Sequence, residues 1–162
     1  MTTQLRVRTE YSFGEVYGPL KRLIAHLKEI GATSAGCVDM LGKTWGHVKW
    51  ATQCEEACIT PMFGAEFIVR NEDFRPTCWV LAEDTRELSK ATTRGFKNKY
   101  YGATTTEEEM AAAKGLIRFA GAALTDPETF DYIDINPGSH LQRARSIALA
   151  KKTKKPIVFT SD

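Results

Sequence analysis

The stretch LRVRTEYS (residues 5–12) combines a β-strand pattern with two arginines, Arg6 and Arg8, spaced two residues apart. Side chains two apart in a strand point the same way, so we expect Leu5 and Val7 on one face and both arginines on the other. Two like charges side by side point at solvent or at an anion. On this pattern alone, an exposed edge strand is the simpler interpretation, and a pair of arginines facing an anionic group is the alternative.

Short apolar runs alternate with amphipathic segments along the rest of the chain. Further strands are predicted at 34–39, 62–69, 77–82, 115–121, 130–135 and 156–162. Helices are predicted at 20–30, 46–58, 85–93, 105–114 and 139–152. This alternation predicts a parallel sheet with helical crossovers, and seven strands favour a barrel over an open sheet. Functional residues of such barrels lie near the carboxyl ends of the strands. Asp39 and Asp162 occur at such ends, and Glu66 lies within its strand.

The composition bounds the class of protein. A chain of 162 residues with 43% hydrophobic and 26% charged residues is typical of one soluble globular domain. The sequence contains no apolar run of membrane-spanning length and no signal-peptide pattern, so we expect no membrane association and a cytoplasmic location. The net charge of +2 does not by itself favour a nucleic-acid partner.

One basic segment is nevertheless interleaved with aromatic residues. RGFKNKYYG (residues 94–102) contains Arg94, Lys97 and Lys99 among Phe and Tyr side chains. This mixture can stack bases and hold phosphates, so weak DNA contact is one interpretation. Solvated lysines in a loop or at a helix end are the simpler one.

Cysteine and histidine patterns give no metal motif of their own. The four cysteines show neither a CxxC pair nor zinc-finger spacing, and we expect reduced thiols in or near the core. His26, His47 and His140 lie within or at the start of predicted helices, where a surface or helix-terminal role is simpler than metal ligation. His47 follows the loop after Asp39 and is the histidine best placed to overhang a barrel mouth.

The order of these motifs resembles the PHP (polymerase and histidinol phosphatase) domain, most closely the one at the N-terminus of bacterial DNA polymerase III α subunits. That family's first strand reads like LHVHSEYS where this chain has LRVRTEYS. Its FGAVEF…GIKPIIGCE is similar to WGHVKWATQCEEACITPMFGAEF (45–67), and its GLIALSGCLSG is similar to GLIRFAGAALT (115–125). The resemblance covers nearly the whole chain. It implies one PHP-type domain over residues 1–162 and an α/β fold with a distorted seven-stranded (β/α)7 TIM-like barrel. Two alternatives stay open for the chain: a stand-alone small protein, or a fragment truncated after the seventh strand.

The resemblance also implies a metal site, most of which this chain lacks. In active members, histidines and carboxylates hold two or three metal ions that activate water for phosphoester hydrolysis. Arg6 and Arg8 stand where that family has the two histidines of its first strand. An arginine has no lone pair to offer a metal. The carboxylates that the resemblance retains are Asp39, Glu66 and Asp162. We therefore expect the arginines to turn into the barrel mouth and to replace the metal cluster by salt bridges.

Three functions remain open at this point. The leading one is a non-catalytic structural or interaction module in DNA replication, with no assigned catalytic residue, no cofactor, and a polymerase core or exonuclease subunit as partner. The second is a metal-dependent phosphoesterase or 3′–5′ exonuclease that keeps a reduced carboxylate site for Mn²⁺, Mg²⁺ or Zn²⁺. The third is a DNA-binding module, in which Arg6 and Arg8 join the basic segment in contacting phosphates.

Overall fold

The computed structural model describes residues 2–14, 16, 18–70, 76–98, 101–121, 127–135 and 140–160. Its strands are β1 (Thr2–Val7), β2 (Ala32–Asp39), β3 (Thr60–Val69), β4 (Thr77–Ala82), β5 (Thr104–Thr105), β6 (Leu116–Ala120), β7 (Tyr132–Ile135) and β8 (Ile157–Phe159). Its α-helices are α1 (Leu20–Glu29), α2 (His47–Glu56), α3 (Thr85–Lys97), α4 (Glu107–Ala112) and α5 (His140–Thr153). Two short 3-10 helices are η1 (Met40–Gly42) and η2 (Pro127–Thr129).

These strands form one sheet in the order β1-β2-β3-β4-β6-β7-β8, and β5 pairs separately with β3. All neighbours on this path are parallel except that β4 runs antiparallel to both β3 and β6. The expectation of a parallel sheet is therefore wrong at β4. The connection from β3 to β4, residues 70–76, is too short for the crossover that a parallel neighbour requires.

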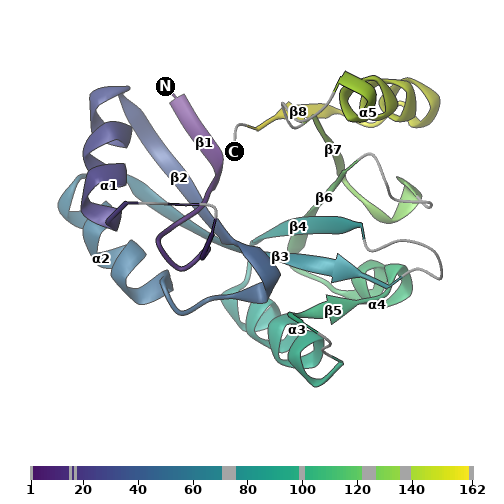
Figure 1. Ribbon diagram of the computed structural model, residues 1–162, viewed down its shortest axis with the longest axis horizontal. Coiled ribbons are helices and arrows are strands. Elements are labelled where there is room, and N and C mark those ends of the chain that lie inside the picture. Colours follow the sequence, from purple (N-terminus) through teal and green to yellow (C-terminus); the bar gives the residue numbers. More distant parts are fainter. Residues whose placement is uncertain are drawn as a thin grey trace.

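The sheet curls, with helices on its convex side. Figure 1 shows α1 and α2 beside β1–β3, α3 and α4 beside β3–β5, and α5 beside β7 and β8. The curl turns the two end strands, β1 and β8, toward each other. The predicted α/β architecture and its path of seven strands are confirmed, but β1 and β8 do not pair within the described ranges, so the predicted closed barrel is not seen.

Apolar side chains fill both faces of the curled sheet. On the convex side, one cluster joins β1 and β2 to α1 and α2, and a larger one joins β3, β4, β6 and β7 to α3, α4 and α5. A third cluster fills the concave side and is built on Val38, Trp79, Leu81 and Phe119. The rings of Trp79 and Phe119 stack there with centroids 3.7 Å apart. The concave interior is thus a packed apolar floor, above which polar residues must find partners.

Helix boundaries follow the predicted ones within a few residues. Asp84 caps α3 by accepting a hydrogen bond from the amide of Arg86 (2.8 Å). The helix continues to Lys97, beyond the predicted end at 93, because Phe96 still packs against the convex core. α4 has a capping box formed by Thr106 and Glu109, and it occupies Glu107–Ala112 within the predicted range 105–114.

Two smaller features were not predicted. β5 is only two residues long and pairs with the end of β3, so no strand pattern marks it. Among the cysteines, Cys58 is exposed at the end of α2, contrary to the expectation that all four lie in or near the core. Within the described residues, no helix combines the length and the apolar character needed to cross a membrane.

Candidate functional site

The end of β1 is irregular, and this irregularity determines which side of the sheet each of its side chains faces. The register of β1 against β2 shifts between Gln4 and Val7. Leu5 consequently packs against the concave cluster, whereas Val7 lies in the convex core. The expectation that Leu5 and Val7 share a face is wrong, because a bulge breaks the alternation of side chains. Arg6 and Arg8 do lie together on the concave side, beside Glu66 of β3.

Both guanidinium groups bind the same carboxylate oxygen. Oε2 of Glu66 accepts hydrogen bonds from Nη2 of Arg6 (2.7 Å) and Nη2 of Arg8 (2.9 Å). The exposed fractions of these side chains are 7% for Arg6, 12% for Arg8 and 6% for Glu66. A buried charge is tolerated only when opposite charges and hydrogen bonds compensate it. Glu66 is therefore the central anion of a buried ion-pair cluster.

Asp134 of β7 connects this cluster to the other end of the sheet. Its Oδ2 accepts a hydrogen bond from Arg6 Nη1 (3.4 Å) and a shorter one from Trp79 Nε1 (2.8 Å). Thr160, directly after β8, donates its hydroxyl to Oδ1 of Asp134 (2.8 Å). The Arg6 guanidinium also lies 5.8 Å from the ring centroid of Trp79. Side chains thus connect β1 to β7 and to the residue after β8, although no backbone pairing joins β1 to these strands within the described ranges.

Sequence reasoning did not single out Asp134. The signal that marks it is an acid inside the apolar strand YIDI, where alternation places Tyr132 and Asp134 on the concave side and Ile133 in the convex core. An acidic residue on the inner face of a short strand needs a partner. The sequence does not say that the partners are Arg6, Trp79 and Thr160, because these lie far away along the chain.

Asp39, at the end of β2, has a different environment. Its Oδ1 accepts hydrogen bonds from the amide of Thr9 (2.7 Å) and the hydroxyl of Ser12 (2.7 Å), and its Oδ2 accepts one from the hydroxyl of Thr9 (2.6 Å). The Ser12 oxygen in turn accepts from the amide of Met40 (3.2 Å). Asp39 is fully buried. Its carboxylate holds the loop after β1 against the end of β2.

Two titratable neighbours of Asp39 are held uncharged. Cys37 Sγ lies 3.7 Å from Asp39 Oδ2, and burial together with this carboxylate raises the pKa of the thiol well above its usual value. His47 begins α2, and its Nε2 lies 3.1 Å from the carbonyl oxygen of Gly64. Burial lowers the pKa of His47. The neutral ring therefore links the start of α2 to β3.

This donor set does not fit a divalent cation. Oε2 of Glu66 is shared by two guanidinium groups, and both oxygens of Asp39 accept hydrogen bonds from the loop. Across the part of the chain that the structure describes, no group of three or more His, Cys, Asp or Glu side chains is placed to hold a metal ion. Asp162, the third carboxylate of the predicted site, lies outside the described residues.

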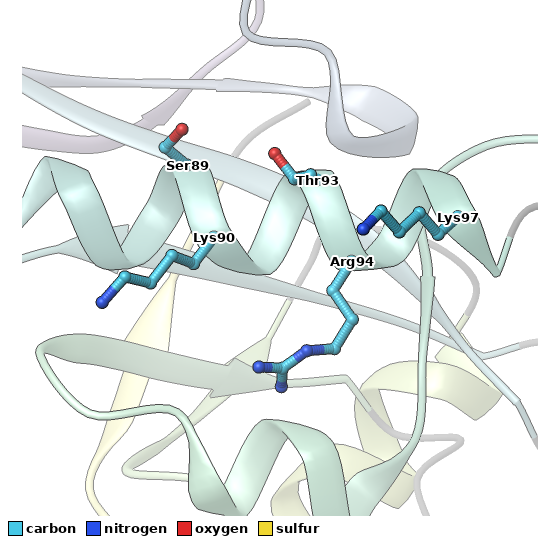
Figure 2. A pocket seen from close by; sticks show the side chains of 5 residues that line it. All are labelled: Ser89, Lys90, Thr93, Arg94 and Lys97. Carbon is cyan, nitrogen blue, oxygen red and sulfur yellow. The ribbon is translucent and has the colours of Figure 1, made fainter.

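The basic residues of the predicted nucleic-acid contact lie elsewhere. Arg94 and Lys97 are exposed on α3, on the convex side of the sheet. They line a shallow hollow of about 310 Å³ together with Ser89, Lys90 and Thr93, shown in Figure 2. Lys99 lies outside the described residues. The structure thus separates these cations from Arg6 and Arg8, and the two sets do not form one surface.

Comparison with known proteins identifies a family and a fold. The protein-family model described as "PHP domain" matches residues 4–154. No match was found among curated protein sequences. Solved structures with the same fold include a candidate metal-dependent phosphoesterase from Bifidobacterium adolescentis, with a TM-score of 0.69 at 11% identity. The alignment with that protein covers 98% of this chain and 86% of the other.

Two further structures share the fold. One is an amidohydrolase from Chromobacterium violaceum, solved with bound sulfate and no metal, with a TM-score of 0.68 at 11% identity and coverage of 99% of this chain and 86% of that one. The other is a two-domain protein from Bacteroides vulgatus that contains a predicted PHP-like metal-dependent phosphoesterase, with a TM-score of 0.64 at 16% identity. This chain is covered to 99% but spans only 51% of that protein. At such identities the likeness shows the fold alone.

Proposed function

The chain belongs to the PHP domain family, and from this premise we propose that it is a non-catalytic member that serves DNA replication as a structural or interaction module. One observation carries the non-catalytic part. Arg6 and Arg8 share Oε2 of Glu66 at 2.7 and 2.9 Å, in the place where the sequence resemblance puts metal-binding histidines.

The electrostatics of this cluster oppose metal binding. A divalent cation at Glu66 would have to displace two guanidinium groups from the same oxygen, and both would then remain buried beside the new charge. Removing one partner of a buried ion pair costs about 3–5 kcal/mol. Arg6 additionally binds Asp134, so its displacement would disturb the bridge to β7 and β8 as well. The arginines supply the positive charge that a metal would otherwise supply.

The replication role rests on the sequence resemblance. The motifs that are similar to the polymerase III α subunit occur in the same order over nearly the whole chain, beginning with LRVRTEYS (5–12). A domain that keeps this pattern while its site is filled by salt bridges can still present surfaces to a polymerase core or an exonuclease subunit. We propose these as its partners.

A reduced metal-dependent phosphoesterase is the second candidate, and the family is what favours it. In that case Asp39, Glu66 and Asp162 would hold one hard cation through oxygen ligands. Asp39 would first have to release the hydroxyl of Thr9 and the loop that it fixes. The structure offers no ligand set for this candidate among the described residues.

Metal analysis separates the two candidates. The purified chain is incubated with Mn²⁺ or Zn²⁺, dialysed exhaustively and analysed for bound metal, alongside Asp39→Asn, Glu66→Gln and the control Glu87→Gln, which changes a partly exposed carboxylate on α3 that pairs with Lys90. We expect far less than one ion per chain in every sample and no hydrolysis of p-nitrophenyl phosphate. One ion per chain that is lost in Asp39→Asn or Glu66→Gln but kept in Glu87→Gln would overturn the non-catalytic proposal.

The replication role needs a separate test. The chain is mixed with a polymerase III α subunit whose own PHP domain has been removed, or with the exonuclease subunit, each from the same source as the chain. We expect co-elution with at least one of them on size-exclusion chromatography. Elution of the chain alone from both mixtures, while it remains folded by circular dichroism, would contradict this role.

A further inference from the structure

The exposed face of α3 carries a stripe of positive charge. The helix contains four cations, Arg86, Lys90, Arg94 and Lys97, and a single carboxylate, Glu87. Residues three, four, seven and eight apart share a helix face, so the cations follow one side of the helix. The first and last of them are eleven positions apart, which is roughly 16 Å along the helix. Glu87 pairs with Lys90 at 2.6 Å and compensates only that end of the stripe.

The surface of this stripe is hollowed and carries hydroxyl groups. Figure 2 shows Ser89 and Thr93 along one edge of the helix and Lys90 and Arg94 along the other, with Lys97 toward the C-terminal end. The hollow that these five side chains line has a volume of about 310 Å³ and contains no carboxylate. Hydroxyl, ammonium and guanidinium groups are the usual donors to phosphate oxygens.

The C-terminal end of α3 packs against the loop that follows β2. A Cβ at Gly42 would lie 3.6 Å from Phe96 Cε2 and against Ala103, whose amide bonds the carbonyl of Leu41 at 3.0 Å. The next residue in this loop is Lys43, and its Nζ lies 4.9 Å from the ring centroid of Phe13. The loop packed against the C-terminal end of α3 therefore carries a further cation, which is held over an aromatic ring.

Two aromatic side chains, Phe13 and Trp45, are exposed on the loops beside the C-terminal end of α3. We call this part of the surface the rim. The exposed fraction is 66% for Phe13 and 65% for Trp45, which are unusually high values for large apolar residues. The loop that carries Phe13 and the loop that carries Trp45 pack closely at Gly46, because a Cβ there would come within 2.7 Å of the Tyr11 ring. Exposed rings beside cations are the components with which proteins bind unpaired bases and their phosphates.

We propose that α3 and the adjacent rim form a binding track for single-stranded nucleic acid. Lys90, Arg94 and Lys97 contact the phosphates along α3. Phe13 and Trp45 stack on bases at the rim, where Lys43 adds a further phosphate contact. This track is built from residues outside the Arg6–Arg8–Glu66 cluster, so it does not depend on whether that cluster binds metal.

The chemistry favours a nucleic acid over an acidic peptide. An acidic peptide would use the cations alone, whereas α3 also offers hydroxyl donors and the loops beside its C-terminal end offer exposed rings. A duplex would hide its bases from Phe13 and Trp45, so a single strand uses the whole surface. The binding is expected to be weak and independent of sequence, since no hydrogen-bonding pocket for a base edge is involved.

Fluorescence anisotropy with a labelled oligo(dT) of about 20 nucleotides tests the proposal, at 50–300 mM NaCl. The variants are Arg94→Gln/Lys97→Gln on α3 and Phe13→Ala/Trp45→Ala at the rim. The control Lys151→Gln/Lys152→Gln removes the same charge from α5. Circular dichroism of each variant verifies folding.

The α3 variant should weaken binding about tenfold at low salt and reduce the log–log salt slope by about 1.4, because each lost phosphate contact to a single strand removes about 0.7. The rim variant should weaken binding without changing the slope, and the α5 control should change neither.

Three outcomes would overturn the proposal. These are no binding at 50 mM NaCl, equal losses in the α3 variant and the α5 control, or displacement of the oligonucleotide by polyglutamate of equal charge as readily as by unlabelled oligo(dT). The last would show a surface for acidic polymers in general. The metal analysis is an independent experiment, so a negative result in the oligonucleotide assay would leave the proposed non-catalytic function intact.

Discussion

The chain uses arginine in two opposite ways. Arg6 and Arg8 are buried on the concave side of the sheet, where both bind Glu66. Arg94 and Lys97 lie exposed on α3, and among the described residues neither has an ion-pair partner. A buried charge must be compensated by the protein itself, whereas an exposed one is compensated by water and remains available to a ligand.

This difference assigns the two regions different tasks. The concave cluster joins β1, β3, β4, β7 and the residue after β8 through side chains, so its charges are committed to holding the curled sheet. Among the described residues, the only ion pair made by the cations of α3 is the one between Lys90 and Glu87. Substitutions should therefore affect stability at the first region and binding at the second.

Glu66→Gln should have the largest effect on stability. The amide keeps the volume of the side chain but removes the negative charge that Arg6 and Arg8 share. We expect the free energy of unfolding to fall by about 3–5 kcal/mol, the cost of leaving a buried ion pair without one partner. Urea unfolding followed by circular dichroism measures it. A change below about 1 kcal/mol would mean that the cluster is not closed to solvent.

Asp134→Asn should have the next largest effect. The asparagine oxygen can still accept a hydrogen bond from Trp79 or Thr160, but the ion pair with Arg6 is lost. Hydrogen bonds to charged groups contribute about 1.5–3 kcal/mol, and we expect a loss in this range. A double-mutant cycle with Arg6→Gln checks the contact. Strict additivity of the two substitutions would show that Arg6 and Asp134 do not interact.

Much of the fold could be predicted because its signals are local. Apolar periodicity, Asp84 as a helix cap and Gly31 after α1 mark elements within a few residues of their observed ends. The direction of β4 could have been read from its short connection to β3. The bulge at the end of β1 could not, because it depends on pairing with β2 rather than on any turn residue.

The candidate site was less predictable, because its contacts are long-range. The resemblance placed Arg6, Arg8 and Glu66 together, and the structure brings these three side chains into contact. It also grouped Asp39 with them, whereas Asp39 binds Thr9 and Ser12 of the neighbouring loop. Asp134 was missed because its role in the site depends on partners on β1, on β4 and after β8. These partners are far apart in the sequence, and the curl of the sheet brings them together.

Acidification should lower the stability of the fold through His47, which links the start of α2 to β3. Burial lowers the pKa of His47 in the folded state below the ordinary value of 6.5, so the folded state binds fewer protons than the unfolded state. The contribution of the neutral ring is present in full above pH 6.5 and is lost as the pH falls toward the folded-state pKa. The urea midpoint should decline between pH 7.5 and 5.5, and less so in His47→Gln. An identical decline in both proteins would assign it to other groups.

The smallest effect on stability is expected for substitutions of the exposed cations on α3. Arg94→Gln/Lys97→Gln removes two exposed charges from a helix that keeps its Asp84 cap and its buried Leu88 and Thr92. Exposed charges contribute little to folding, so the urea midpoint should stay at the wild-type value. The same double variant is expected to lose oligonucleotide affinity. A fall in the midpoint comparable to that of Asp134→Asn would show that these cations stabilise the fold. The concave cluster and the α3 face would then not differ in their contribution to stability.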